Sequence, residues 1–351
     1  MGAFAGAGAW PGVLRSLTSG EDLPAEVAKG ALDHILTGEA TDAQIAAFIV
    51  ALRIKGETPD EVVGLVAAMV EAAAPLDLPD PRNTVDLVGT GGSAALGGRA
   101  FNVSTMASIV AAGAGATVCK HGNRKASSAS GSTDLLEALG VAVELDGPGV
   151  VECVRGAGVG FAFARKFHPS MRYVAGVRTE LAIPTVFNIL GPLSHPGEVG
   201  RVVFGVADPR LLDLLPRVLV QRGLVHAWVV HGEGGLDELT TAGSTEVIEV
   251  RGADVRRFRV EPEEAGLARV TLEDLAVGGP EENAAAARAM LAGEQGPVRD
   301  MVVYNAAAGL VVAGLAPDLA AGVPLAAASI DEGRAAGVLE RLIEASQGAA
   351  A

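Results

Sequence analysis

The sequence predicts an α/β fold: a small all-helical domain plus a larger α/β domain with a mainly parallel central sheet and flanking helices. Apolar residues follow helical spacing through about the first 76 residues, and strands alternate with helices after the proline-rich segment 75–81. A chain of 351 residues is long enough for two domains, at roughly 100–200 residues each. We expect a helical domain at 1–78, joined by helices near 168–190, and an α/β domain at 79–351.

The first 76 residues contain four stretches in which apolar side chains recur at helical spacing. These stretches are residues 13–17, 28–36, 45–52 and 62–70. Thr41 or Asp42 can cap the third helix, and Gly56 follows its last turn. Thr58 and Pro59 open the fourth helix, because proline is favoured in the first turn of a helix.

The remainder of the chain alternates between strand and helix patterns. Strands are expected at 84–88, 116–119, 141–145, 201–206 and 226–230, and helices at 104–114, 133–139, 211–223, 281–291, 299–314 and 330–343. This alternation implies right-handed crossovers and a mainly parallel sheet. Such sheets bind ligands beyond the carboxyl ends of their strands, so the sequence predicts chemistry in the loops that follow strands.

Composition excludes several classes of protein. The chain has 27 basic and 42 acidic residues, and this net charge of −15 argues against a nucleic-acid partner and against an anionic membrane surface. Hydrophobic residues make up 49%, which is too many for a disordered chain. Cys119 and Cys153 show no metal-ligand spacing and fit a reducing cytoplasm. We expect no secretory leader, because no basic segment precedes an apolar run, and no membrane span, because no run reaches about 18 strongly apolar residues.

Two loops after the proline-rich segment contain signals for phosphate binding. Gly89, Gly91 and Ala94 fit a dinucleotide-binding glycine pattern, but no acid follows about 20 residues later to hold a ribose, which excludes a nicotinamide cofactor. The glycine loop is therefore either a phosphate cradle or an ordinary turn between strand and helix. Asn102 or Ser104 is a natural N-cap of the next helix, and the same polar groups can form an anion pocket there.

A third loop, at 120–132, is dense in hydrogen-bond donors. It contains three cations, a histidine, an asparagine and four serine hydroxyls. Such a set suits a polyphosphate, although a solvated polar loop is the simpler alternative. From Lys120 to Arg178 there are eight basic and five acidic residues, so the negative total does not exclude an anionic substrate.

Two further clusters allow more than one interpretation. Asp237 and Glu238 can bind Mg²⁺, but adjacent acids are more often surface charge. Residues 165–169, with Arg172 and Arg178, either face an anionic substrate or form an exposed basic helix face.

Several of these segments occur in the order typical of one enzyme family. They are V-G-T-G-G at 88–92, N-V-S-T at 102–105, K-H-G-N-R at 120–124, F-H-P-S-M-R at 167–172, P-T-V-F-N at 184–188 with L-G-P-L at 190–193, and G-L-D-E at 235–238. On these motifs the chain resembles the anthranilate phosphoribosyltransferase family from about Trp10 to its C-terminus. The resemblance implies a small helical domain joined to a larger α/β domain, with dimerisation through the helical part.

The resemblance implies transfer of phosphoribose from 5-phosphoribosyl 1-pyrophosphate (PRPP) to the amine of anthranilate, a step of tryptophan biosynthesis, with Mg²⁺ as cofactor. Pyrophosphate leaves C1 of the sugar as nitrogen attacks, through an oxocarbenium-like transition state. No residue is expected to be catalytic as a nucleophile, because positioning and electrostatic stabilisation suffice. The expected partners are the two small-molecule substrates and a second copy in a homodimer, with no nucleic acid and no membrane.

The resemblance also carries binding roles onto matching positions. PRPP would be held by Gly89, Gly92, Ser93, Asn102, Val103, Ser104, Thr105, Lys120, His121, Gly122, Asn123, Arg124, Lys125, Ala126, Ser127, Ser128 and Ser132. Anthranilate would contact Gly89, His121, Asn123 and Arg178. Mg²⁺ would contact Ser104, Asp237 and Glu238.

The chain departs from the family's usual pattern beside the expected pyrophosphate site. Ser93 stands where the family usually has aspartate, and Ala100 where a hydroxyl residue is common. Lys125 replaces a small residue, and the loop 93–101 is longer than usual. These changes bear on how PRPP is held and leave the reaction class unchanged.

Two alternatives share the expected fold. One is an enzyme like the pyrimidine nucleoside phosphorylases, and the other is a non-enzymatic relative that binds nucleic acid. The pair Asn123 and Arg178 and the pair Asp237 and Glu238 favour the transferase over the phosphorylase. The net charge of −15 disfavours the nucleic-acid binder.

Overall fold

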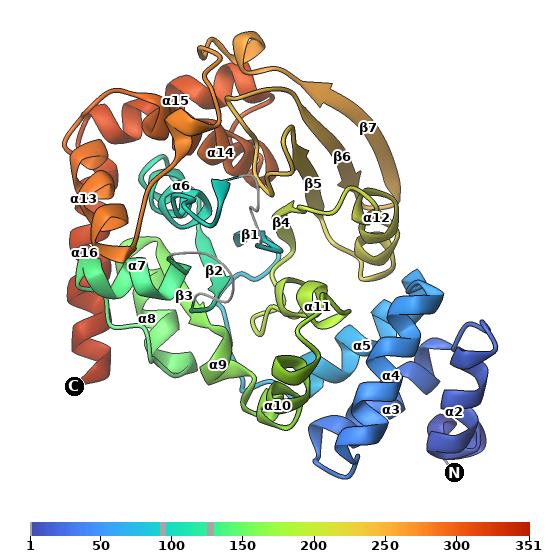
Figure 1. Ribbon diagram of the computed structural model, residues 1–351. Coiled ribbons are helices and arrows are strands. Elements are labelled where there is room, and N and C mark those ends of the chain that lie inside the picture. Colours follow the sequence, from blue (N-terminus) through green and yellow to red (C-terminus); the bar gives the residue numbers. More distant parts are fainter. Residues whose placement is uncertain (1, 92–95, 125–129) are drawn as a thin grey trace. The chain divides into compact units, whose positions relative to one another are not determined.

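The computed structural model describes residues 2–91, 96–124 and 130–351 (Figure 1). The chain forms two compact units, of which unit 1 is Met1–Pro75 with Ala164–Pro196 and unit 2 is Leu76–Phe163 with Gly197–Ala351. The predicted fold class is confirmed, because the described part of unit 1 is helical and unit 2 has a mostly parallel sheet with flanking helices. Among the residues described, no helix combines the length and apolar character needed to cross a membrane.

Unit 1 is a helical bundle made from two segments of the chain. Its α-helices are α1 (Ala3–Gly6), α2 (Ala9–Thr18), α3 (Ala25–Leu36), α4 (Asp42–Lys55), α5 (Pro59–Glu71), α9 (Ala164–Phe167), α10 (Arg172–Leu181) and α11 (Phe187–Leu193). The four predicted helical stretches correspond to α2, α3, α4 and α5. Helix α10 packs against α3 and α4, and α11 packs against α5, so the later segment completes the bundle.

Local sequence signals fix the beginnings of α4 and α5, as predicted. Thr41 Oγ1 accepts a hydrogen bond from Gln44 N at 3.3 Å, and the Gln44 side chain accepts one from Thr41 N at 2.9 Å. Thr58 and Glu61 form the same reciprocal pair at the start of α5. Gly56 ends α4 with a φ of 89°, a conformation that glycine adopts without strain.

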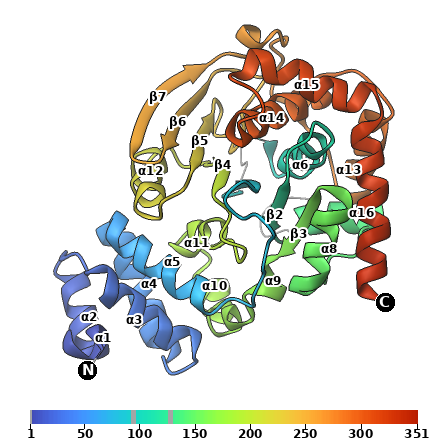
Figure 2. The same ribbon diagram turned by 180° about the vertical axis from the view of Figure 1, so that it is seen from behind.

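Unit 2 is built on a seven-stranded sheet with the order β3-β2-β1-β4-β5-β6-β7 (Figure 2). The strands are β1 (Val85–Gly89), β2 (Val118–Gly122), β3 (Val159–Phe163), β4 (Arg201–Gly205), β5 (His226–Gly232), β6 (Thr245–Arg251) and β7 (Asp254–Val260). Pairs from β3 to β5 are parallel, whereas β6 and β7 extend the sheet in antiparallel fashion. The chain moves outward from β1 on one side and from β4 on the other, so the strand order switches between them. Loops diverge at such a switch and leave room for a ligand.

Eight α-helices occur in the described part of unit 2. They are α6 (Val103–Gly113), α7 (Ser132–Leu139), α8 (Gly147–Ala157), α12 (Leu211–Gln221), α13 (Pro280–Leu291), α14 (Pro297–Ala313), α15 (Leu319–Asp331) and α16 (Arg334–Ala350). Helices α6 and α14 contact β1 and each other, so they share one face of the sheet (Figure 1). Helix α12 contacts β5 and β6, and the right-handed crossover from β4 to β5 places it on the opposite face.

One predicted element and one predicted boundary are wrong. The segment 141–145 pairs with no described strand, although Val141, Val143 and Leu145 are buried as a strand pattern requires. Its Ala142 N donates instead to Ser346 Oγ of α16 at 3.0 Å, so a helix covers this segment. The predicted helix at 330–343 corresponds to α16, but its start is wrong, because α15 ends before Gly333, which has a φ of 72°, and α16 begins after it.

One helix and three strands that frame the sheet carried no sequence prediction: α8, β3, β6 and β7. Helix α8 begins with Gly-Pro-Gly, which looks like a loop, yet Asp146 Oδ1 accepts a hydrogen bond from Gly149 N at 3.0 Å and caps it. Strand β3 follows directly, and β6 and β7 form the antiparallel hairpin. Most side chains of β7 are charged and exposed, so its sequence lacks the alternation of apolar and polar residues that would predict a strand.

Candidate active site

Hydrogen bonds join the loops that follow β1 and β4, at the point where the strand order switches. Thr90 N donates to Gly205 O at 3.0 Å, and Ala207 N donates to Thr90 Oγ1 at 3.2 Å. The glycine loop singled out in the sequence therefore starts where α/β sheets bind ligands.

Asp237 reaches this switch from the loop after β5. Its Oδ2 accepts a hydrogen bond from Gly91 N at 2.7 Å. Gly89 and Gly205 leave room for it, because a Cβ on either residue would overlap Oδ2 or the backbone oxygen of Asp237. Asp237 is only 6% exposed. The acid pair is thus packed into the switch and is not ordinary surface charge.

Glu238 lies beside Asp237 in an unfavourable electrostatic setting. Burial raises the pKa of the Glu238 carboxyl well above its ordinary value, and the charge of Asp237 and a hydrogen bond with it raise this pKa further. A divalent cation relieves such repulsion. Mg²⁺ takes one or two protein carboxylates and keeps water or phosphate oxygens as its other ligands, so this donor set fits Mg²⁺ bound with a phosphorylated substrate. Among the described side chains, no group of three or more His, Cys, Asp or Glu forms an all-protein metal site.

Two buried side chains of opposite charge, Asp86 and Lys120, interact electrostatically close to these carboxylates. Asp86 of β1 accepts a hydrogen bond from His121 N at 3.1 Å, and Lys120 Nζ donates to Leu87 O at 2.6 Å. Burial raises the pKa of Asp86 to about 7, although the Lys120 charge lowers it. Burial lowers the pKa of Lys120, whereas the negative charges of Asp86, Glu238 and Asp237 act in the opposite direction and raise it.

This arrangement corrects the predicted boundary of the third loop. Strand β2 runs to Gly122, so Lys120, His121 and Gly122 are strand residues and not loop residues. Parallel pairing with β3 continues to Gly122 opposite Phe163, which explains the longer strand. Lys120 consequently supplies positive charge from inside the sheet.

In the part of the chain that the structure describes, no side chain caps the N-terminus of α6. Asn102 occupies the cap position but directs its side chain to Ser130, donating to Ser130 O at 3.1 Å and accepting from Ser130 Oγ at 2.8 Å. Thr105 Oγ1, in the first turn, is buried and has no hydrogen-bond partner among the described residues. The predicted cap position is confirmed for Asn102 and wrong for Ser104, which lies inside the helix, but the Asn102 side chain makes no capping hydrogen bond. An uncapped helix N-terminus with a buried free hydroxyl suits an anion.

The other described residues of the third loop are partly engaged. Arg124 pairs with Glu137 of α7, with Nη2 and Oε1 2.7 Å apart. Ser132 Oγ donates to Asn123 O at 3.0 Å, in contact range of Gly122, where a Cβ would collide with it. Arg124 therefore anchors the loop to α7 rather than projecting freely.

The structure brings together most, but not all, of the predicted site residues. Thirteen of the predicted residues belong to unit 2, where they lie at the ends of β1 and β2, at the starts of α6 and α7, and in the loop after β5. They are Gly89, Asn102, Val103, Ser104, Thr105, Lys120, His121, Gly122, Asn123, Arg124, Ser132, Asp237 and Glu238. Gly92, Ser93, Lys125, Ala126, Ser127 and Ser128 lie outside the described residues.

Arg178 belongs to unit 1, on α10. Its guanidinium lies 5.5 Å from the centre of the Phe187 ring. Burial lowers the pKa of Arg178, and among the described residues no carboxylate opposes the shift. A desolvated guanidinium of this kind is suited to bind a carboxylate from a ligand.

Two buried asparagines went unnoticed in the sequence. Asn283 Oδ1, from α13, accepts a hydrogen bond from Asn102 N at 2.9 Å, at the entrance to α6. Asn305 of α14 binds both backbone groups of Leu239, next to Glu238. The one sequence signal for these two asparagines is that each is a polar residue within a largely apolar helical stretch.

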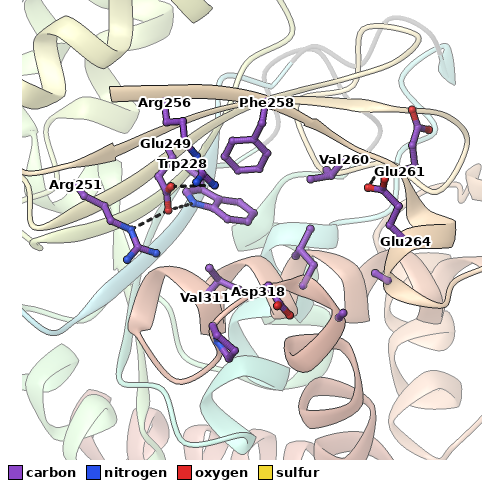
Figure 3. A pocket seen from close by; sticks show the side chains of 14 residues that line it. Trp228, Glu249, Arg251, Arg256, Phe258, Val260, Glu261, Glu264, Val311 and Asp318 are labelled. Carbon is purple, nitrogen blue, oxygen red and sulfur yellow. Dashed lines mark hydrogen bonds and ion pairs between the residues drawn. The ribbon is translucent and has the colours of Figure 1, made fainter. Parts of the chain in front are cut away.

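A hollow of about 490 Å³ lies elsewhere in unit 2, against the β6–β7 hairpin and the start of α15 (Figure 3). Trp228 and Phe258 meet edge to face in it, with ring centres 5.6 Å apart. Glu249 accepts from Trp228 Nε1 at 3.2 Å and from Arg251 Nε at 2.9 Å. The charges of Glu249 and Arg251 are already paired with each other. The loop that carries Asp237 and Glu238 does not line this hollow, so we do not assign the active site to it.

Comparison with known proteins agrees with this site. Residues 81–336 match the model of the glycosyl transferase family a/b domain, and residues 11–73 match that of its helical bundle domain. The anthranilate phosphoribosyltransferase of Chloroflexus aggregans is 50% identical over 339 residues, which cover 96% of this chain and 98% of that protein. The chain belongs to the anthranilate phosphoribosyltransferase family.

Solved structures of this family have the same fold. The anthranilate phosphoribosyltransferase of Thermus thermophilus is 44% identical, with a TM-score of 0.88 over 95% of this chain and 99% of that one. The Saccharomyces cerevisiae enzyme, solved in complex with PRPP and Mg, is 29% identical, with a TM-score of 0.88 over 97% and 98%. The resemblance seen in the motifs is thereby confirmed, and the chain is an enzyme of the glycosyltransferase class.

Proposed function

We propose that the protein transfers the 5-phosphoribosyl group of PRPP to the amine of anthranilate, in tryptophan biosynthesis. The products are N-(5-phosphoribosyl)anthranilate and pyrophosphate. The observation that carries this proposal is the packing of Asp237 and Glu238 into the switch between β1 and β4, in a chain of this family. Membership alone gives the reaction class, and the buried acid pair supplies the place for a phosphate-bound cation.

Asp237 and Glu238, with Ser104, would hold Mg²⁺. When bound, the ion neutralises charge on the pyrophosphate as it leaves. The raised pKa of Glu238 supports this role, because the cation would keep that carboxyl ionised. Lys120 places a balancing positive charge close by.

The remaining residues of the site would bind and orient PRPP. The uncapped start of α6, with Thr105 Oγ1, offers donors to phosphate oxygens, and Asn102 and Ser132 border the same region. The bond from C1 to pyrophosphate breaks while the bond from C1 to the anthranilate nitrogen forms. No protein nucleophile takes part, so catalysis rests on orientation and on donors that stabilise the leaving group.

Arg178 would pair with the carboxylate of anthranilate. Its desolvated guanidinium beside Phe187 supports this role, because a bidentate Arg–carboxylate pair gains most where water is excluded. We expect Arg178→Ala to raise the KM for anthranilate far more than the KM for PRPP, measured by steady-state kinetics. Arg165→Ala, at an exposed position of α9, is the control and leaves both constants near wild type. Equal increases in both constants for Arg178→Ala would contradict the assignment.

The proposed reaction is tested by the fluorescence of anthranilate. Purified protein with Mg²⁺ is expected to consume this fluorescence only after PRPP is added, and chelation of Mg²⁺ with EDTA stops the reaction. Absence of any loss with folded protein, Mg²⁺ and PRPP present would overturn the proposal. A phosphorylase, by contrast, would consume inorganic phosphate and a pyrimidine nucleoside.

The proposal extends to the setting of the enzyme. Resemblance to the family supports a homodimer formed through the helical part, which sedimentation equilibrium tests directly. The net charge of −15 and the presence of only two cysteines, both buried, support a cytoplasmic enzyme without nucleic-acid or membrane partners.

A further inference from the structure

We infer that Asn305 is a positioning residue for the cation-binding acid pair, a role that rests on the proposed function of Asp237 and Glu238. Asn305 lies on α14, a helix buried along most of its length, and is itself 3% exposed. It makes no contact with substrate in this role. It acts by fixing the backbone immediately after Glu238.

The Asn305 side chain forms hydrogen bonds with both backbone groups of Leu239, and we call this pair of bonds the clamp. Asn305 Oδ1 accepts from Leu239 N at 3.0 Å, while Asn305 Nδ2 donates to Leu239 O at 2.8 Å. The same Nδ2 donates to Met301 O at 2.9 Å, one turn earlier on α14. This third bond fixes which way the amide faces, because an exchanged amide would direct its oxygen at a carbonyl oxygen.

The clamp matters because the acid pair belongs to a loop and not to a strand or helix. On the other side of the pair, Leu236 O accepts a hydrogen bond from Gly232 N at 2.8 Å. Asp237 and Glu238 thus lie between one anchor on β5 and one on α14. The negative charges of Asp237 and Glu238 repel each other, and this repulsion would push the two carboxylates apart. The two anchors hold the backbone of the pair in place against it.

Loss of a group that orients metal ligands costs about 10- to 100-fold in metal affinity or activity. Because Asn305 is assigned no contact with substrate, we expect the loss to fall on Mg²⁺ affinity. For Asn305→Leu we expect the Mg²⁺ concentration for half-maximal rate to rise about 10-fold or more, with kcat at saturating Mg²⁺ close to wild type. Asn305→Asp keeps the acceptor for Leu239 N and the volume of the side chain, but it turns an oxygen toward the carbonyl oxygens of Leu239 and Met301, so we expect a rise at least as large. Because this variant neither adds nor removes bulk, a rise in both variants reports loss of the clamp and not a change in packing volume.

Ser329→Ala is the matched control. Ser329 is equally buried in unit 2 and donates to Val110 O at 2.8 Å, far in the sequence from the acid pair. It should lower the melting temperature and leave the Mg²⁺ dependence unchanged. If Asn305→Leu and Asn305→Asp change the Mg²⁺ dependence no more than Ser329→Ala does, Asn305 has only a structural role and the inference fails.

A second readout does not depend on activity. Hydrogen exchange of a peptide spanning residues 236–241 reports the Leu239 amide directly, and we expect faster exchange in both Asn305 variants but not in Ser329→Ala. Unchanged exchange would overturn the clamp. A wild-type protein that binds Mg²⁺ and shows the exchange effect, yet transfers no phosphoribose to anthranilate, would overturn the proposed function and leave the positioning role intact.

Discussion

At the scale of single residues, two glycines without side chains shape the candidate site. Gly89 ends β1, Gly205 ends β4, and Asp237 fills the space that their side chains would occupy. Neither glycine has a positive φ, so the requirement is for space and not for an unusual backbone conformation. The same packing buries the acid pair and raises the pKa of Glu238.

We expect Gly205→Ala to lower the free energy of unfolding by about 1–3 kcal/mol, because overpacking forces the backbone of Asp237 to move. It should also raise the Mg²⁺ concentration for half-maximal activity. Urea unfolding and Mg²⁺ titration measure the two effects. Gly348→Ala, on α16 where an added Cβ meets no atom within 4 Å, is the control and should be neutral or slightly stabilising. Wild-type behaviour of Gly205→Ala would contradict the packing described.

His168, in unit 1, predicts a dependence of stability on pH. Burial lowers its pKa to about 4, against an ordinary value near 6.5. The folded state therefore disfavours the protonated ring, and its stability is complete above pH 6.5 and falls as the pH approaches 4. We expect a loss of about 2 kcal/mol between pH 7 and pH 5 from this group.

Urea unfolding followed by Trp10 fluorescence measures this effect. Trp10 lies in unit 1, and a Trp228→Phe background leaves it as the single tryptophan. His168→Gln in that background should flatten the dependence between pH 7 and pH 5. An unchanged slope would show that other groups cause it.

At the scale of elements, helix starts are set by short signals, whereas strand ends depend on neighbours. The Thr41–Gln44 pair at α4 was predictable because all its atoms come from four consecutive residues. The end of β2 was not, because Lys120 and His121 look like loop residues until Asp86 on β1 is placed beside them. The segment 141–145 shows the reverse error, in which a strand-like pattern is buried by α16.

We expect Thr41→Ala to lower the free energy of unfolding by about 1 kcal/mol, since it removes the N-cap of α4. Thermal or urea unfolding measures the loss. Thr18→Ala is the control, because the exposed Thr18 hydroxyl bonds only carbonyls of its own helix and caps no helix start. Similar losses in both variants would argue against the capping box as the cause.

At the scale of the whole molecule, the sequence was sufficient for the fold class and for the motifs that lie at the switch. It predicted Gly89 and the Asp237–Glu238 pair as separate features, and left the acid pair open to interpretation as surface charge. What joins them is a hydrogen bond between residues 146 positions apart, together with burial, and neither can be derived from local spacing. Asn305 was beyond prediction for the same reason, since its partner Leu239 lies on another element.

The central claim is that this chain moves phosphoribose from PRPP to anthranilate at that switch. The most direct test is the product balance of a reaction with PRPP, anthranilate and Mg²⁺, followed by mass spectrometry and a pyrophosphate assay. We predict one N-(5-phosphoribosyl)anthranilate and one pyrophosphate for each anthranilate consumed, with the yield lost in an Asp237→Asn, Glu238→Gln double variant at limiting Mg²⁺. Anthranilate left unconsumed by the wild-type enzyme, or consumed without release of pyrophosphate, would contradict the claim.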